Sequence, residues 1–109
     1  MNPWLVLTLS IASEVAGTLL LKASYGLSQW APTAGMGLCY AAAIWLMGLA
    51  SKQMEIGMAY AVWAGAGTAL IALLGVALFS ESASWGKALG VGCIVLGVLL
   101  LHLNQAAPA

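Results

Sequence analysis

The chain has 109 residues, of which 63% are hydrophobic and only 6% are charged. Soluble domains carry roughly a quarter charged residues, so this composition excludes a water-soluble surface and favours a membrane protein. The formal net charge is zero, and without a basic patch to hold phosphates we expect no nucleic-acid partner. Cys39 and Cys93 lack the close spacing of a metal or redox motif, so we expect neither a metal nor a cofactor.

Four apolar segments follow one another along the chain, at residues 4–21, 33–50, 57–79 and 85–103. Each is close to the ~20 residues needed to cross ~30 Å of hydrocarbon. A membrane β-strand needs only about ten residues with alternating faces, and these longer runs do not alternate. The sequence therefore predicts an all-α integral membrane protein with four transmembrane helices, forming a single domain over residues 1–109.

The first segment carries one acidic residue, Glu14, near its middle. A charge at that depth costs about 2.5–3.5 kcal/mol on insertion scales, and such acids mark ion or substrate pathways. The helical repeat places on or near its face the residues Leu7, Ser10, Ile11, Gly17, Thr18 and Leu21. Ser10, Gly17 and Thr18 make this face small and weakly polar, so we expect it, with Leu7, to line a pocket.

No basic residue shares the core of the first segment with Glu14. Burial penalises the charged form of a carboxyl group, so a proton and a cation would compete for this one carboxylate. The alternative is a protonated, purely structural Glu14 that hydrogen-bonds a neighbouring helix.

Aromatic residues of the second and third segments extend the candidate site. Tyr60 and Trp63 are three residues apart and share a helical face, and aromatic faces attract cations. Tyr40 can add a third ring and a hydroxyl group. Alone, an aromatic pair at this spacing is typical of packing, but beside a buried acid it indicates a pocket for a lipophilic cation.

Glycines in the third and fourth segments suggest two further roles. Gly65 and Gly67 weaken the third helix at one point, which is typical of a kink, and we interpret them as a hinge for alternating access. Gly90 and Gly97 are a heptad apart in the fourth segment. Small residues at such spacing let membrane helices approach closely, so we assign this segment to subunit association.

The basic residues divide almost evenly between the two sides of the predicted bundle. Lys22 and Lys87 fall on one side of the membrane, and Lys52, with His102, falls on the other. Lysine and arginine bias normally orients a membrane protein. So weak a bias permits insertion in both orientations.

Three parts of the sequence together resemble the small multidrug resistance family, and the resemblance covers essentially the whole chain. These parts are residues 13–18 followed by Lys22, residues 59–67, and the fourth-segment glycines. The resemblance implies an antiparallel, dual-topology homodimer in the bacterial inner membrane that exchanges protons for organic cations. It implies that Glu14 binds the proton and the substrate alternately. It also implies a substrate pocket lined by Tyr40, Tyr60 and Trp63. It further implies a kink formed by Gly65 and Gly67, and a dimer contact that contains Gly90 and Gly97.

Two subtypes of this family differ near the acid. Guanidinium exporters typically carry a Trp three residues after the acid and a hydroxyl group in the second span, where this chain has Gly17 and Ala43. The chain is therefore more similar to the quaternary-ammonium and multidrug subtype. A guanidinium or polyamine exporter on the same scaffold, and a non-transport structural membrane subunit, remain alternatives. No nucleophile–base pair is visible, so we do not expect an enzyme.

Overall fold

A computed structural model describes residues 2–104. It contains four helices, α1 (Pro3–Ala23), α2 (Trp30–Ala50), α3 (Ile56–Phe79) and α4 (Trp85–Leu103), and no strand within residues 2–104. Each helix is long and apolar enough to cross a membrane. This confirms the predicted all-α fold with four apolar helices. Met1 and residues 105–109, which the single-domain expectation includes, lie outside the described residues.

The helices around the first connection are longer than the sequence predicts. Helix α1 ends at Ala23 rather than at residue 21, and α2 begins at Trp30 rather than at residue 33. Pro32 lies in the first turn of α2, where backbone N–H groups have no intrahelical partner and the missing donor of proline costs little. At the start of α1, the side chain of Asn2 accepts a hydrogen bond from the Trp4 N–H at 2.8 Å and caps the helix.

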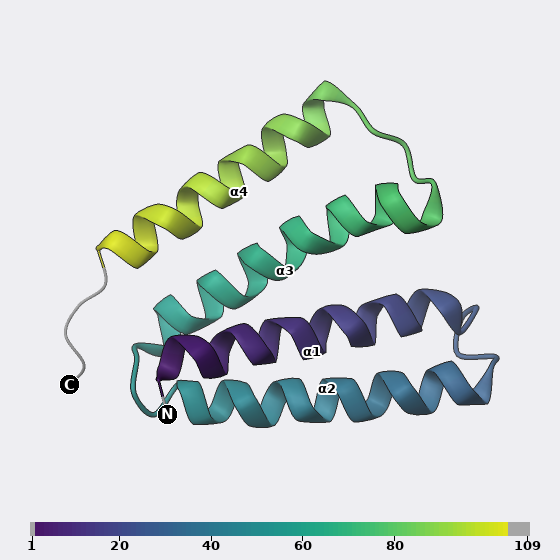
Figure 1. The fold of residues 1–109 in the computed structure, drawn as a ribbon, viewed down its shortest axis with the longest axis horizontal. Coiled ribbons are helices and arrows are strands. Elements are labelled where there is room, and N and C mark those ends of the chain that lie inside the picture. The colour runs from purple at the N-terminus through teal and green to yellow at the C-terminus, as the bar shows by residue number, and fades with distance from the viewer. Residues whose placement is uncertain (1, 105–109) are drawn as a thin grey trace.

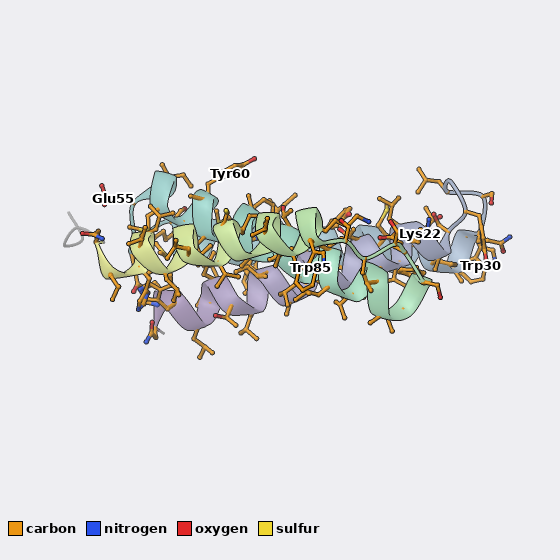
Figure 2. All side chains as sticks on the ribbon, turned by 90° about the horizontal axis from the view of Figure 1, so that it is seen from above. Lys22, Trp30, Glu55, Tyr60 and Trp85 are labelled. Carbon is orange, nitrogen blue, oxygen red and sulfur yellow. The ribbon has the colours of Figure 1, made fainter. Side chains whose placement is uncertain are left out.

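The four helices lie side by side in the order α4, α3, α1, α2 (Figure 1). The molecule measures 44 × 34 × 17 Å and is therefore a flat slab. Helix α4 has no buried residue of its own. The α1–α2 and α3–α4 connections lie at one end of the slab, and the α2–α3 connection lies at the other (Figure 1). Figure 2 shows Lys22 and Trp30 near the first end and Glu55 near the opposite end.

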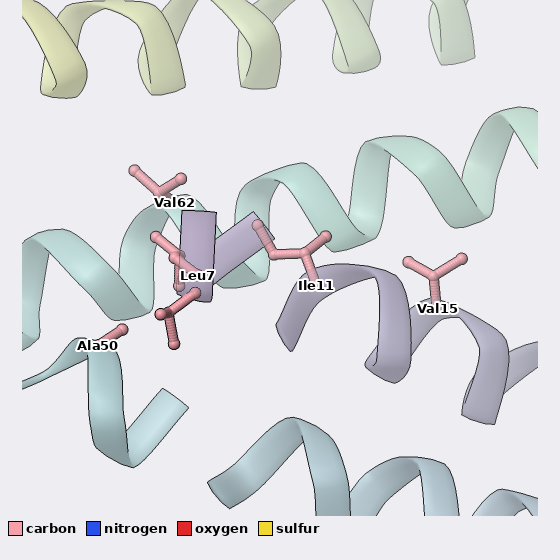
Figure 3. Close-up of a cluster of buried hydrophobic side chains, with 6 residues drawn as sticks. Leu7, Ile11, Val15, Ala50 and Val62 are labelled. Atoms are coloured by element: carbon pink, nitrogen blue, oxygen red, sulfur yellow. The ribbon is translucent and has the colours of Figure 1, made fainter. Parts of the chain in front are cut away.

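The hydrophobic core lies where α1 meets α2 and α3 (Figure 3). It consists of Val6, Leu7, Ile11, Val15, Ala50 and Val62. Four of these six belong to α1, so α1 is the helix held between two neighbours. The core therefore fixes the position of the helix that carries Glu14.

Candidate functional site

Glu14 is half-buried on α1 and borders two cavities. One has a volume of about 440 Å³ and lies between α1 and α3. The other, of about 240 Å³, is also lined by residues of α2, including Tyr40. Trp63 lines both cavities with Glu14, so the acid and the indole ring form their common wall. The first volume falls within the range of about 300–1,000 Å³ that is usual for ligand pockets.

The carboxylate of Glu14 accepts a hydrogen bond from a neutral hydroxyl group. The Thr18 hydroxyl donates to Glu14 Oε1 at 3.0 Å and lies 2.8 Å from the Tyr40 hydroxyl oxygen. A hydroxyl group has one proton to donate, so when Thr18 donates to Glu14 it accepts from Tyr40. Within residues 2–104, no lysine or histidine lines either cavity. The charge of this carboxylate is therefore available to a ligand.

Two glycines make room for the functional groups. A Cβ atom at Gly67 would lie 2.9 Å from Glu14 Oε2, so only glycine lets the acid approach α3 this closely. A Cβ atom at Gly17 would lie 2.7 Å from two ring carbons of Tyr40. The absence of a side chain at Gly17 therefore lets the Tyr40 ring pack on α1 and reach Thr18.

The two aromatic residues of α3 differ in their surroundings. Their ring centroids are 5.8 Å apart, with an interplanar angle of 50°. Trp63 lines the two cavities beside Glu14, whereas Tyr60 is 59% exposed and lines neither of them. Within residues 2–104, Trp63 Nε1 is buried without a hydrogen-bond partner, a state that costs about 1–3 kcal/mol. Trp63 therefore contributes an aromatic ring to the cavity walls beside Glu14.

Leu7 and Ser10, two of the expected pocket residues, are buried between helices. Leu7 belongs to the core, and the Ser10 hydroxyl donates to the Ala43 carbonyl oxygen at 2.6 Å. Neither residue lines the cavities beside Glu14, and Gly17 does not line them either. In the single chain these residues hold α1 against α2, and their role in a substrate pocket stays a prediction.

Sequence reasoning missed four members of the wall of the 440 Å³ cavity, which are Ala64, Thr68, Ile71 and Ala72. Ile71 lines the cavity between α1 and α3 together with Trp63 and Gly67. These three residues are four positions apart along α3, so the helical repeat could have found Ile71 once Gly67 was placed beside the acid.

The glycines that were expected to form the hinge and the dimer contact lie in different surroundings. Helix α3 runs without a break through Gly65 and Gly67, and a Cβ atom at Gly65 would lie 3.1 Å from Val98 Cγ2 of α4. At Gly90 and Gly97 an added Cβ atom would meet nothing within 4 Å. The hinge and the dimer contact stay predictions.

Comparison with known proteins gives the family. The family model described as Small Multidrug Resistance protein matches residues 2–94. The chain is 37% identical to the multidrug transporter EmrE of Escherichia coli (strain K12), covering 99% of each chain. It is 37% identical to the quaternary ammonium compound-resistance protein QacE of Escherichia coli, covering 100% of this chain and 99% of QacE.

A third relative is the nicotine metabolites export pump subunit NepA of Paenarthrobacter nicotinovorans. The chain is 42% identical to NepA over 101 residues, which are 93% of this chain and 87% of NepA. The four apolar helices and these full-length relatives confirm the family resemblance and a location in the bacterial inner membrane. The chain therefore belongs to the small multidrug resistance family, as a multi-pass membrane protein.

Proposed function

We propose that this protein is a proton-coupled antiporter that exports lipophilic and quaternary-ammonium cations across the bacterial inner membrane. The relatives support the export role, since their names describe multidrug transport, quaternary-ammonium resistance and export of nicotine metabolites. The observation that supports coupling of protons to cation transport is the environment of Glu14. This one carboxylate is bonded to a neutral hydroxyl group and borders two cavities that no described basic residue lines.

Exchange follows from the free-energy cost of keeping this carboxylate charged without an opposite charge beside it. In an apolar environment an isolated charge is too costly to maintain, so Glu14 holds either a proton or a cation. A proton entering from one side of the membrane releases the cation, and loss of the proton on the other side admits the next cation. The face of Trp63 adds an attraction that reaches about 2 kcal/mol when the cation is desolvated.

The functional unit in this proposal is an antiparallel homodimer. The single chain supports this by its flatness, by the lack of buried residues on α4, and by the open space beside Gly90 and Gly97. Two inverted copies of one sequence would make the inward-open and outward-open states nearly equal in energy, as inverted repeats do in larger transporters. Gly65 and Gly67 would absorb the bend between these states.

The packing of Tyr40 on Gly17 supports the multidrug subtype over the guanidinium subtype. Guanidinium exporters typically have a Trp at the position of Gly17, and a side chain there would collide with the Tyr40 ring, whose carbons lie 2.7 Å from the Cβ position. Transport of guanidinium or a polyamine, but not of tetraphenylphosphonium, would assign the protein to the alternative class of exporter.

The test is solid-supported membrane electrophysiology on proteoliposomes, with tetraphenylphosphonium, a quaternary ammonium ion, guanidinium and a polyamine as substrates. Wild-type protein should give cation-induced currents that depend on the pH gradient, and Glu14→Gln should give none. Glu55→Gln is the matched control, because Glu55 is exposed and lies just before α3, at the end of the slab opposite to Lys22. Wild-type currents from Glu14→Gln would exclude this mechanism. Absence of cation-induced currents from the wild-type protein with every cation tested would favour a structural subunit.

A further inference from the structure

A third cavity, of about 510 Å³, lies at the end of the slab that carries Lys22. Its wall comes from α1, from the α1–α2 connection and from the end of α3, and it contains Tyr25, Phe79 and Glu81. Thr18 and Ile71 line both this cavity and the 440 Å³ cavity beside Glu14. The two cavities therefore share part of their wall, and Thr18, which hydrogen-bonds to Glu14, belongs to both.

Glu81 is an exposed residue whose side chain lies against Gly75 in the wall of this cavity. The backbone N–H of Glu81 donates to the Gly75 carbonyl oxygen at 3.2 Å, just after Ser80 ends α3 with a φ of 54°. The Glu81 side chain then folds back onto Gly75. A Cβ atom at Gly75 would lie 2.9 Å from Glu81 Cδ and would collide with Glu81 Oε1. The missing side chain at Gly75 therefore allows the carboxylate to rest on α3.

The α1–α2 connection brings an aromatic ring to the same cavity. Tyr25, Gly26 and Leu27 have φ values of 50°, 73° and 69°, a run of left-handed residues that is unfavourable for tyrosine and leucine. Ser24, fully buried, stabilises the turn, since its hydroxyl donates to the Leu21 carbonyl oxygen and accepts from the Leu27 N–H. Strained backbone held in this way is concentrated at functional sites.

We propose that this cavity is an entry site for monovalent organic cations. The Glu81 carboxylate contacts the charged group, the rings of Tyr25 and Phe79 contact the apolar body, and the cation then passes Thr18 and Ile71 to reach Glu14. The inference rests on the proposed transport function and adds a second acid to its substrate path.

Lys22 narrows the class of ligand at this entry site. It lines the same cavity as Glu81, so the part of the wall formed by residues 2–104 carries one positive and one negative charge. A monovalent cation can lie against Glu81 alone, whereas the second charge of a polyamine would meet the lysine. The site therefore selects against polycations before they reach Glu14.

The entry site predicts a change in rates rather than in final affinity. The charges of a cleft change the rate of association of a charged ligand by roughly tenfold or more, and salt weakens this effect. Without the Glu81 carboxylate, the charge of Lys22 on the same wall would repel the approaching cation. Binding of tetraphenylphosphonium to the detergent-solubilised full chain can be followed by stopped-flow tryptophan fluorescence. At low salt, Glu81→Gln should lower the association rate constant roughly tenfold. The dissociation rate constant should fall with it, because the cation leaves by the same path.

One control variant and two further variants test the entry site. Glu55→Gln removes an exposed acid at the opposite end and should keep the wild-type rates. Gly75→Ala keeps the charge of Glu81 but displaces the carboxylate from α3, and alanine favours the helix, so association should slow by a smaller factor. In a Glu14→Gln background, weak equilibrium binding of tetraphenylphosphonium should remain, and adding Glu81→Gln should remove it.

The outcomes separate this inference from the proposed function. Wild-type association rates in Glu81→Gln at low salt, or an equal slowing in Glu55→Gln, would overturn the entry site while pH-dependent binding at Glu14 persists. If the wild-type protein binds cations with an affinity that Glu14→Gln does not change, the proposed function fails instead. Failure of every form to bind any cation would overturn both.

Discussion

A methyl group added at Gly67 should separate the contact with Glu14 from the general role of glycine in α3. The Cβ atom of Gly67→Ala would lie 2.9 Å from Glu14 Oε2, whereas ordinary contacts begin at 3.4 Å. The carboxylate must therefore move by about half an ångström, which stretches the 3.0 Å hydrogen bond from Thr18 to the limit of a useful bond.

The magnitude follows from the bond that is lost. Hydrogen bonds to charged groups contribute about 1.5–3 kcal/mol, and 1.4 kcal/mol corresponds to a factor of ten. Wherever the proton competes with the cation for this carboxylate, the dissociation constant for tetraphenylphosphonium should rise about tenfold to a hundredfold. The difference should narrow at alkaline pH, because the proton then competes less for the carboxylate.

The assay is equilibrium binding of tetraphenylphosphonium to purified protein at several pH values. Gly48→Ala is the control, since an added Cβ atom there would meet nothing within 4 Å. Alanine is favoured over glycine in a helix by about 0.8–1.0 kcal/mol, so unfolding does not explain a loss. Wild-type affinity in Gly67→Ala across the pH range would refute the argument. Transport lost by both Gly65→Ala and Gly67→Ala, with binding intact, would point to the hinge instead.

Two further predictions concern the ring and the assembly. Trp63→Ala should weaken tetraphenylphosphonium binding by about thirtyfold, which corresponds to about 2 kcal/mol of cation–π attraction, whereas Trp63→Phe should keep most of the affinity. An equal loss in both variants would assign the effect to the indole N–H. Gly90→Leu combined with Gly97→Leu should weaken the association of two copies, because larger side chains keep membrane helices apart. Energy transfer between labelled copies in vesicles measures this, and undiminished transfer would contradict the fourth-helix contact.

The sequence predicted the helices well because hydrocarbon thickness sets their length and composition marks their position. Its error at the start of α2 has a local cause, since Pro32 is a helix breaker only beyond the first turn. The acid and its nearest partner were also predictable, because Thr18 lies one turn after Glu14 on the same face and hydrogen-bonds to it.

The exact extent of the site could not be predicted, because packing decides which turns of a face remain open. Leu7 and Ser10 share the face of Glu14 but lie one to two turns earlier, where α1 is in the core or bonded to α2. Trp63 and Tyr60 share a face too, yet only Trp63 lines the cavities. The contact of Glu81 with Gly75 depends on a left-handed turn at Ser80, which the sequence pattern does not reveal.

The slab shape has a consequence for how strongly two newly inserted chains would associate in the membrane. A chain of this form leaves Glu14 half-buried and one entire helix without a buried residue, so a solitary copy presents an acid near hydrocarbon. Such exposure costs about 2.5–3.5 kcal/mol on insertion scales, and covering the acid with a second chain recovers part of that energy. Glu14, which would bind the transported cation, would then also favour association of two chains. Diluting the protein in lipid would leave single chains that do not transport.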